Sequence, residues 1–334
     1  MEFAEIAAHW TAKSEGVLPS YKGAMLRGVL GYALRKGHCT KPWETMCTSC
    51  ERQGVCGYAR LYEPVSSMGD GLTEFGMHDP MRSFVVNSLN HRTRFQEGDR
   101  WDFSICLFGP AVSQVPDVIA VLCLPTPTGL GFEGLQGLIQ IDAVTISSPV
   151  QEIPSDGTFR VTVVPALKVG MPNQDGGVRW SVRMDFLSVT SLKNGGKSST
   201  FEVKVLGRAL LRRAFGMIAL YGSEDQSNWI RTHRHELEAS WGSVWVDRDE
   251  TRWRRWGRTS SRQQRSYEVE GLIGRVQIRN VPEMWLSLLR LCEVLHVGKG
   301  ATFGLGRFKL SVKREPTIDN HDAFVVGETH AGSS

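Results

Sequence analysis

The sequence predicts an α+β protein with two tandem modules, each made of strands around two helices. Residues 101–108 and 138–146 alternate as strands do, and residues 113–124 between them carry apolar side chains at helical spacing. A similar order returns near the end of the chain, where a helical pattern and a glycine-rich loop precede a strand pattern at 308–312. Strands around two helices in each half predict two ferredoxin-like (RRM-like) modules.

Length and composition agree with two packed modules. The chain has 334 residues, of which 41% are hydrophobic and 22% charged, and its net charge is +4. A charge this small means that any nucleic-acid surface must come from local clusters of Arg and Lys. The sequence shows neither the apolar segment of a signal peptide nor an apolar run of about 18 residues, so we expect a cytoplasmic protein.

The first module is predicted over residues 1–150. Residues 3–10 can form a strand, and residues 19–36 then have the apolar spacing of a helix. The basic side chains of this helix, Arg27, Arg35 and Lys36, lie off its apolar face.

A cysteine-rich segment, residues 39–57, follows this helix. It contains Cys39, Cys47, Cys50 and Cys56, and its polar composition cannot build a core of its own. The spacing predicts a structural zinc site with four sulfur ligands, which would fold the segment. Four reduced thiols in a loop are the alternative interpretation.

The second module is predicted over residues 158–313, after a linker at 149–157. Strand patterns occur at 159–164 and 180–189, and a long helix is expected to end near Tyr221. Along this helix Lys204, Arg208 and Arg212 are spaced four apart and form a basic stripe, unless they are only a solvated face. The tail at 314–334 has no periodicity, and we expect it to be loose.

A glycine-rich loop precedes the last predicted strand. Gly298, Gly300, Gly304 and Gly306 fall within nine residues, and Lys299 and Arg307 add positive charge. Exposed amides in such a loop can bind an anion, whereas a tight structural turn is the simpler interpretation. Because the order is helix, loop, strand, the loop is not a dinucleotide or P-loop fingerprint, which needs strand, loop, helix.

An arginine- and tryptophan-rich run lies upstream of this loop. Trp253 and Trp256 are interleaved with arginines, a composition that suits phosphate pairing and base stacking. The arginines of the run are Arg254, Arg255, Arg258 and Arg262.

Residues 253–310 resemble the carboxy-terminal half of the CRISPR repeat-RNA-processing endoribonucleases, the Cas-six family of the RAMP superfamily. The resemblance lies in Ser261-Arg-Gln263, in Gly271 and Gly274, and above all in His296-Val-Gly-Lys-Gly300 with Phe303-Gly-Leu-Gly-Arg307. The Leu-Arg-Gly stretch on the first helix is also similar to the family. The resemblance implies two ferredoxin-like modules. It also implies that the chain binds CRISPR repeat RNA or crRNA, and other Cas proteins of an effector complex are further candidate partners.

The resemblance also implies metal-independent cleavage on the 3′ side of the repeat hairpin, by attack of the RNA's 2′-hydroxyl on the adjacent phosphorus. Histidine suits the proton transfers, because its ordinary pKa lies near neutrality. His38 is the first candidate for the general base, with Tyr21 and Lys36 as helpers; it could instead be a zinc ligand or a surface residue. His296 is the second candidate, or it orients the loop.

The candidate RNA-binding residues combine the basic groups and the glycine loop. They are Arg27, Arg35, Lys204, Arg208, Arg212, Arg254, Arg255, Arg258, Arg262, His296, Gly298, Lys299, Gly300, Gly304, Gly306 and Arg307. Two other functions remain open. The first is a RAMP-type subunit that binds crRNA without cutting it, and the second is a zinc-stabilised protein-interaction subunit, which leaves the Trp/Arg run unexplained.

Overall fold

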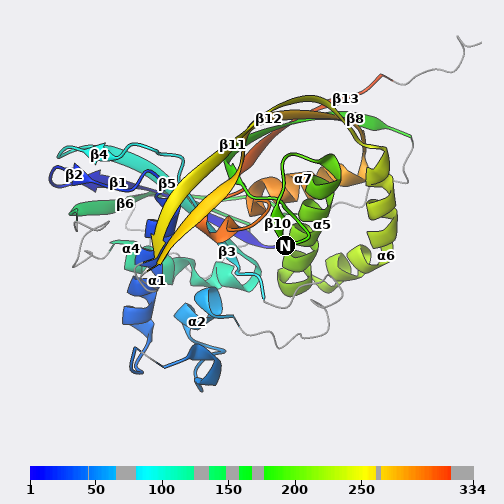
Figure 1. Cartoon of the computed structure of the whole chain (residues 1–334). Coiled ribbons are helices and arrows are strands. Elements are labelled where there is room, and N and C mark those ends of the chain that lie inside the picture. The colour runs from blue at the N-terminus through cyan, green and yellow to red at the C-terminus, as the bar shows by residue number, and fades with distance from the viewer. Residues whose placement is uncertain are drawn as a thin grey trace, which may run out of the picture.

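The computed structural model describes residues 1–43, 45–64, 80–123, 135–147, 158–167, 177–260 and 265–316. These residues form two large sheets, antiparallel except for one parallel edge strand in the first, each with helices packed on one face (Figure 1). The predicted linker at 149–157 lies outside the described residues. So does the predicted tail, except for residues 314–316.

The amino-terminal sheet has the strand order β3-β5-β1-β6-β7. Its strands are β1 (Phe3–Ala12), β3 (Phe84–Asn87), β5 (Arg100–Phe108), β6 (Gly137–Ile146) and β7 (Arg160–Val163), and its helices are α1 (Gly23–His38) and α4 (Val115–Cys123). Alternate residues of β1, such as Ile6 and Trp10, are buried among side chains of both helices. Without β7, the order β6-β1-β5-β3 is that of the ferredoxin-like motif.

Strand β7 corrects the predicted division of the chain. We expected residues 159–164 to open the second module, but β7 pairs in parallel with β6 of the first sheet, with Arg160 opposite Ala143. The strand itself was predicted correctly. Alternation specifies a strand and its two faces, but it does not specify which sheet edge the strand joins.

The carboxy-terminal sheet has the order β11-β12-β8-β13, which repeats the ferredoxin-like arrangement. Its elements are β8 (Arg179–Thr190), α5 (Val203–Tyr221), α6 (Glu224–Ser240), β11 (Trp245–Ser260), β12 (Arg265–Pro282), α7 (Met284–Leu295) and β13 (Phe308–Arg314). Helices α5 and α7 lie under the curved sheet, and α6 stands at its side (Figure 1). Strands β11 and β12 form a long hairpin, which contains the Trp/Arg run.

Short elements connect these layers. They are β2 (Gly16–Val17), β4 (Arg94–Phe95), β9 (Lys193–Asn194), β10 (Lys197–Ser198), α2 (Gly57–Tyr62) and short 3₁₀ turns that include η4 (Ala301–Phe303) in the glycine loop. Within the described ranges, no helix is both long enough and apolar enough to cross a membrane.

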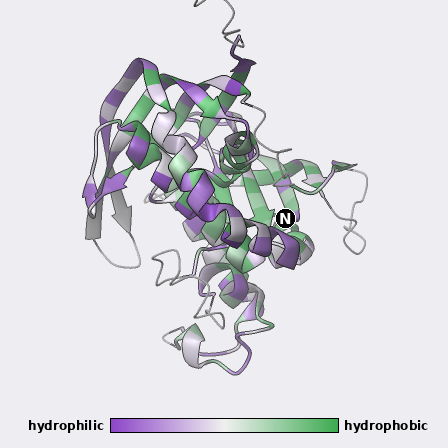
Figure 2. Ribbon diagram, turned by 90° about the vertical axis from the view of Figure 1, so that its right-hand side faces the viewer, coloured by the Kyte–Doolittle hydropathy of each residue, from purple (hydrophilic) through white to green (hydrophobic). Residues whose placement is uncertain are grey.

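One hydrophobic cluster spans both modules, and a second lies within the first module. Val85 and Phe108 of the amino-terminal sheet belong to the same buried cluster as Phe215 of α5 and Leu289 of α7. Hydrophobic and hydrophilic residues alternate along much of the strands (Figure 2), but β3 is buried on both faces: Phe84 and Val86 belong to the cluster of the first module, and Val85 belongs to the cluster that spans both modules. The shared core fixes the glycine loop between the modules.

Candidate nucleic-acid site: a cationic pocket at the glycine loop

The four glycines of the loop are required by close packing. Gly298, Gly300, Gly304 and Gly306 all have positive φ angles, between +71° and +86°. A Cβ atom on Gly306 would collide with the Val297 carbonyl oxygen, and one on Gly304 with the carbonyl oxygen of Val86 in β3. Only glycine combines these angles with such close backbone approach.

Several amides of the loop bond within the protein. The Lys299 N–H donates to the Ser191 carbonyl at 3.1 Å, and the Gly306 N–H donates to the Val189 carbonyl at 3.0 Å. The Arg307 N–H donates to the Ser188 hydroxyl oxygen at 2.9 Å. These three amides are therefore occupied, and the tight-turn interpretation holds for this part of the loop.

The loop also joins the modules through two residues of the first one. The Tyr21 hydroxyl donates to the Phe303 carbonyl, and the Arg27 guanidinium lies 4.7 Å from the Phe303 ring centroid and 4.9 Å from that of Tyr62. Such cation–π contacts hold the loop against the start of α1. In this structure Tyr21 and Arg27 connect the modules.

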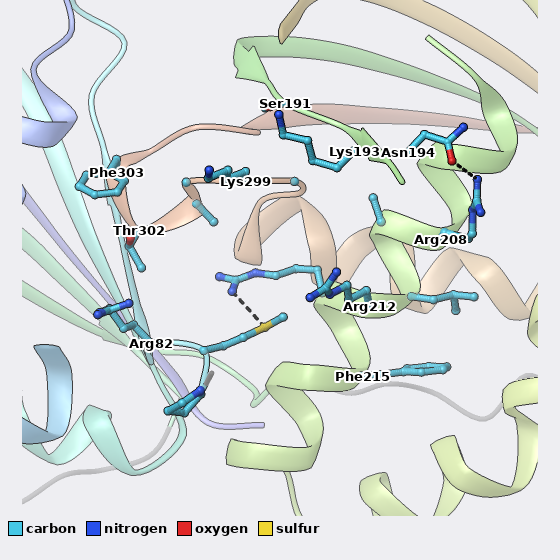
Figure 3. Close-up of a pocket in the computed structure, with 18 of the residues that line it drawn as sticks. Arg82, Ser191, Lys193, Asn194, Arg208, Arg212, Phe215, Lys299, Thr302 and Phe303 are labelled. Carbon is cyan, nitrogen blue, oxygen red and sulfur yellow. Dashed lines mark hydrogen bonds between the residues drawn. The ribbon is translucent and has the colours of Figure 1, made fainter. Parts of the chain in front are cut away.

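A pocket of about 780 Å³ lies beside the loop, bounded by α5, α6, β9 and the segment before β3. Figure 3 shows Lys299 and Arg212 on facing walls, with Arg82 and Arg208 nearer the edges. Glu238 is the carboxylate among the lining residues, and it pairs with Arg234 at 3.0 Å. The cationic lining residues are Arg82, Lys193, Arg208, Arg212, Arg213, Arg234 and Lys299.

The exposed cations are arranged for an anionic ligand. Arg208, Arg212 and Lys299 are exposed, and they come from two segments about 90 residues apart in the chain. Arg208 also donates to the Asn194 side-chain oxygen at 3.3 Å, which directs it along the turn after β9. Five of the predicted RNA-binding residues thus lie together, since Gly298 and Gly300 also line the pocket, whereas Lys204 is exposed on α5 outside the lining.

Arg213 plays a different part in this pocket. It is 7% exposed, and its Nε and one terminal nitrogen donate to the Leu295 carbonyl at 3.1 and 2.9 Å, at the end of α7. Burial lowers the pKa of Arg213 to about 10. A cation here compensates the negative end of the helix dipole, so Arg213 supports the pocket from behind.

Sequence reasoning missed Arg82, Lys193 and Arg234. Arg82 precedes a short strand, Lys193 sits in a two-residue strand, and Arg234 lies in a helix rich in polar residues. None of these positions has a local pattern that distinguishes a pocket wall from ordinary surface. Only the folded chain brings them beside the glycine loop.

His296 is unsuited to contact RNA in this structure, which corrects two of our predictions. It is 1% exposed, and its Nδ1 lies 3.1 Å from the Leu305 carbonyl oxygen. A carbonyl can only accept, so Nδ1 carries the proton and donates. Burial, together with the nearby charges of Arg307 and Arg213, lowers the pKa of His296 to about 3, and the neutral side chain orients the loop.

The predicted catalytic group does not assemble at one place. Tyr21 precedes α1, whereas Lys36 and His38 are in its last turn, and a helix of this length spans roughly 24 Å. The His38 Nε2 atom lies 3.9 Å from a carboxylate oxygen of Asp117 in α4. Tyr21 and His38 therefore cannot act on the same phosphate in this structure.

Arg35 is another correction, because it is 4% exposed and cannot offer its guanidinium to a phosphate. That group donates to the carbonyls of Trp43 and Thr45 in the cysteine-rich segment. The spacing of basic residues gave no sign of this burial, since the partners lie in an irregular loop.

The cysteine-rich segment does not form a metal site as placed. Within the described part of the chain, no group of three or more His, Cys, Asp or Glu is arranged to hold a metal. Cys39, Cys47, Cys50 and Cys56 are all half-buried thiols, and burial raises the pKa of Cys47. The donor set of the predicted zinc site is present, but its geometry does not fit the ion here.

The Trp/Arg run lies on the long hairpin. Arg254 and Arg255 are exposed on β11, and Arg255 pairs with Glu270 of β12 at 3.3 Å. Arg258 is placed by its backbone opposite Tyr267, and Arg262 falls outside the described residues. Arg307, at the end of the glycine loop, is half-buried.

Comparison with solved structures shows the class of fold. A Cas6 product complex matches with a TM-score of 0.56 and 12% identity, over 93% of this chain and all of the other. Cas6 from Thermus thermophilus matches with a TM-score of 0.52 and 11% identity, over 93% of this chain and 98% of the other. The two ferredoxin-like modules therefore have the fold of Cas6 proteins.

Sequence comparison finds a similarity to the same family in the carboxy-terminal part of the chain. Residues 184–308 match the family of the CRISPR-associated endoribonuclease Cas6, and residues 1–165 match a family described as an N-terminal domain. The carboxy-terminal part of the chain is thus similar to the Cas6 family, over a match that ends just after the glycine loop. An uncharacterized protein of Archaeoglobus fulgidus is 24% identical over 302 residues, which cover 88% of this chain and 92% of that one.

Proposed function

We propose that this chain is a CRISPR repeat-RNA endoribonuclease. The observation that carries the proposal is the cationic pocket at the glycine loop, inside the region that matches the Cas6 endoribonucleases. The substrate is a CRISPR repeat RNA, cut on the 3′ side of its hairpin. The crRNA product can stay bound through the same phosphate contacts, and other Cas proteins are candidate partners of that complex.

The reaction in this proposal needs no metal ion. The RNA's 2′-hydroxyl loses a proton and its oxygen bonds to the adjacent phosphorus; the bond from phosphorus to the 5′-oxygen then breaks. The products are a 2′,3′-cyclic phosphate and a 5′-hydroxyl. The protein supplies a base, an acid for the leaving oxygen, and positive charge for the phosphorane.

Charge for holding the RNA backbone comes from Lys299, Arg208 and Arg212 in the pocket and from Arg254 and Arg255 on the hairpin, all of them exposed. Lysine binds phosphate as a point charge, and arginine can bind it through two parallel hydrogen bonds. In this proposal they hold the RNA backbone at the pocket and along the hairpin. Their main effect is on affinity.

His38 is the proposed base, with the Lys36 ammonium as the acid that protonates the leaving 5′-oxygen. Asp117, 3.9 Å from the His38 Nε2 atom, can hold the ring and stabilise its protonated form. The RNA then extends along α1, from the pocket near Tyr21 to His38 in the last turn.

A crRNA-binding subunit without activity is the second candidate. It is favoured by one observation: the described residues that line the pocket include no histidine. In that case RNA binds at the pocket with the same affinity, but no cleavage occurs.

The deciding experiment incubates purified protein with its repeat RNA in EDTA and identifies the ends of the product. Cleavage to a 2′,3′-cyclic phosphate and a 5′-hydroxyl is expected. An RNA with hydrogen in place of the scissile 2′-hydroxyl should bind equally well and stay intact. Cutting of this analogue would exclude the mechanism, and binding of the normal RNA without any cleavage would favour the subunit.

A further inference from the structure

Two aromatic rings stand exposed at the end of α1 that carries His38. Tyr32 on the helix is 47% exposed, and Trp43 in the cysteine-rich segment is 50% exposed. Their ring centroids are 5.5 Å apart and their planes are inclined at 46°. Large aromatic surfaces of this kind are normally buried, so an exposed pair in contact indicates a binding surface.

Trp43 is held in place from behind. The Arg35 guanidinium lies 4.4 Å from the centroid of the Trp43 ring, and it donates to the carbonyl of the same residue. Arg35 is itself fixed between this ring and Tyr58, whose centroid is 5.5 Å away. The exposed ring is thus preorganised, which lowers the entropy that a ligand must remove on binding.

The charges around the pair favour an anionic partner. Lys36 is exposed one helical turn beyond Tyr32, and Arg52 is exposed in the same cysteine-rich segment. Glu51 is neutralised by Lys41, whose ammonium lies 2.8 Å from its carboxylate. Aromatic faces together with exposed cations of the same helix and segment suit a single-stranded nucleic acid, whose bases stack while its phosphates pair.

We propose that Tyr32 and Trp43 form a stacking platform for unpaired nucleobases of the bound RNA. The proposal rests on the proposed function, because it requires an RNA that runs along α1. It adds a site at which unpaired bases of the RNA near His38 turn outward and stack on these two rings. Tyr32 lies nine residues beyond the start of α1, roughly 14 Å along the helix, and Trp43 follows the far end of the helix, so the platform contacts different nucleotides from those at the pocket.

The experiment measures binding of the uncleavable 2′-deoxy repeat RNA, so that catalysis does not enter. Trp43→Ala should weaken binding roughly 5- to 100-fold, the range for loss of one stacked base, and Trp43→Phe should restore most of it. Trp245→Ala, which removes a ring with the same 50% exposure on β11, is the matched control and should change little. Melting temperatures of the variants verify that each one folds.

A second arm locates the stacked base. Abasic substitutions are placed one at a time in the single-stranded RNA beside the hairpin. One of them should weaken binding to the normal protein yet cost almost nothing further with Trp43→Ala, because both changes remove the same contact. Independent losses at every position would overturn the platform.

The remaining outcomes are distinct. Normal affinity of Trp43→Ala for RNA would overturn the platform but leave the proposed function intact, and exposed Met46 and Val55 would then favour a protein partner at this surface. Failure of the normal protein to bind any repeat RNA would overturn both proposals.

Discussion

Two basic side chains are buried where α7 ends, and both serve the glycine loop. Arg213 neutralises the carbonyl end of the helix at Leu295, and His296 follows with a φ of 63°. With a ψ of 166° this backbone conformation is adopted essentially only by glycine, so the surrounding contacts hold His296 in it. Charge at this point comes from the arginine alone, because the histidine is held neutral.

The neutral state of His296 predicts a pH-dependent stability. Its pKa is about 3 in the folded protein, against an ordinary value of 6.5. As pH falls below 6.5 the unfolded state takes up a proton that the folded state refuses, so the free energy of unfolding decreases toward pH 3, by up to about 1.4 kcal/mol per pH unit. Denaturant melts between pH 7 and 4 should show this loss.

His296→Asn supplies the control for that loss. Asparagine keeps a donor for the Leu305 carbonyl, but it does not titrate. Its stability should fall less between pH 7 and 4 than that of the normal protein, whereas His235→Asn, at an exposed position on α6, should behave normally. Equal pH slopes for His296→Asn and the normal protein would contradict the assignment.

At the level of residues, the sequence identified side chains whose role follows from exposure and charge. Lys299, Arg208 and Arg212 are such groups, and they meet in the pocket. Sequence failed for Arg35 and His296, because their burial depends on carbonyls of irregular segments that no local pattern specifies. A basic residue looks the same in a sequence whether it meets solvent or a buried carbonyl.

Among the elements, the glycine loop combines two functions. It closes α7 onto β13, and through Gly304 it packs on Val86 of the other module. Both the contact between the modules and the pocket wall that carries Lys299 therefore depend on the shape of the loop. Replacing one of its glycines by a residue with a side chain should therefore lower the stability of the whole protein.

Gly306→Ala tests this dependence. The added Cβ would meet the Val297 carbonyl at a φ of +71°, so we expect a loss of about 3 kcal/mol or more in the free energy of unfolding. Gly28→Ala is the matched control, since its Cβ would meet nothing within 4 Å on an exposed face of α1. That change should be neutral or stabilise by up to about 1 kcal/mol, as in any helix interior. Equal stability of both variants would refute the packing argument.

The cysteine-rich segment carries the prediction about metal. If Cys39, Cys47, Cys50 and Cys56 bind zinc, the segment must rearrange from its present placement. Protein purified without chelator should then contain one zinc per chain, and EDTA should lower its melting temperature. Cys47→Ser should be more destabilising than Cys292→Ser in metal-loaded protein. Elemental analysis that finds no metal would reject the site.

Most elements followed from periodicity, and the exceptions have a physical reason. The strand at 180–189 and the helix ending at Tyr221 were expected close to their observed bounds, as β8 and α5. Helix α6 was missed because its exposed surface dilutes the apolar pattern, although Ser223 and Gln226 form a capping box at its start. The pairing of β7 with β6 was missed because the sheet edge that a strand joins is set by tertiary packing and not by the local sequence pattern.

At the scale of the whole molecule, the proposed RNA-binding pocket and the proposed cleavage site at His38 are separated along α1. The cations of the pocket lie at one end of α1, and His38 lies at the other. Binding and cleavage should therefore respond to different residues, provided that one RNA reaches both ends. An RNA confined to the pocket would leave His38 without a role.

The separation is measurable with variants at each end of α1. Lys299→Ala and Arg212→Ala should each weaken RNA binding and reduce the slope of log affinity against log salt by roughly one counterion, while the cleavage rate at saturating protein changes little. His38→Ala should keep affinity within a few-fold, yet single-turnover cleavage should fall roughly a hundredfold or more, because a proton-transfer group acts in the transition state. Filter binding at two salt concentrations and single-turnover rates give both quantities. Normal cleavage by His38→Ala would show that another residue is the base. Because His296 is buried, the arginines and lysines of the pocket would then be the next residues to test.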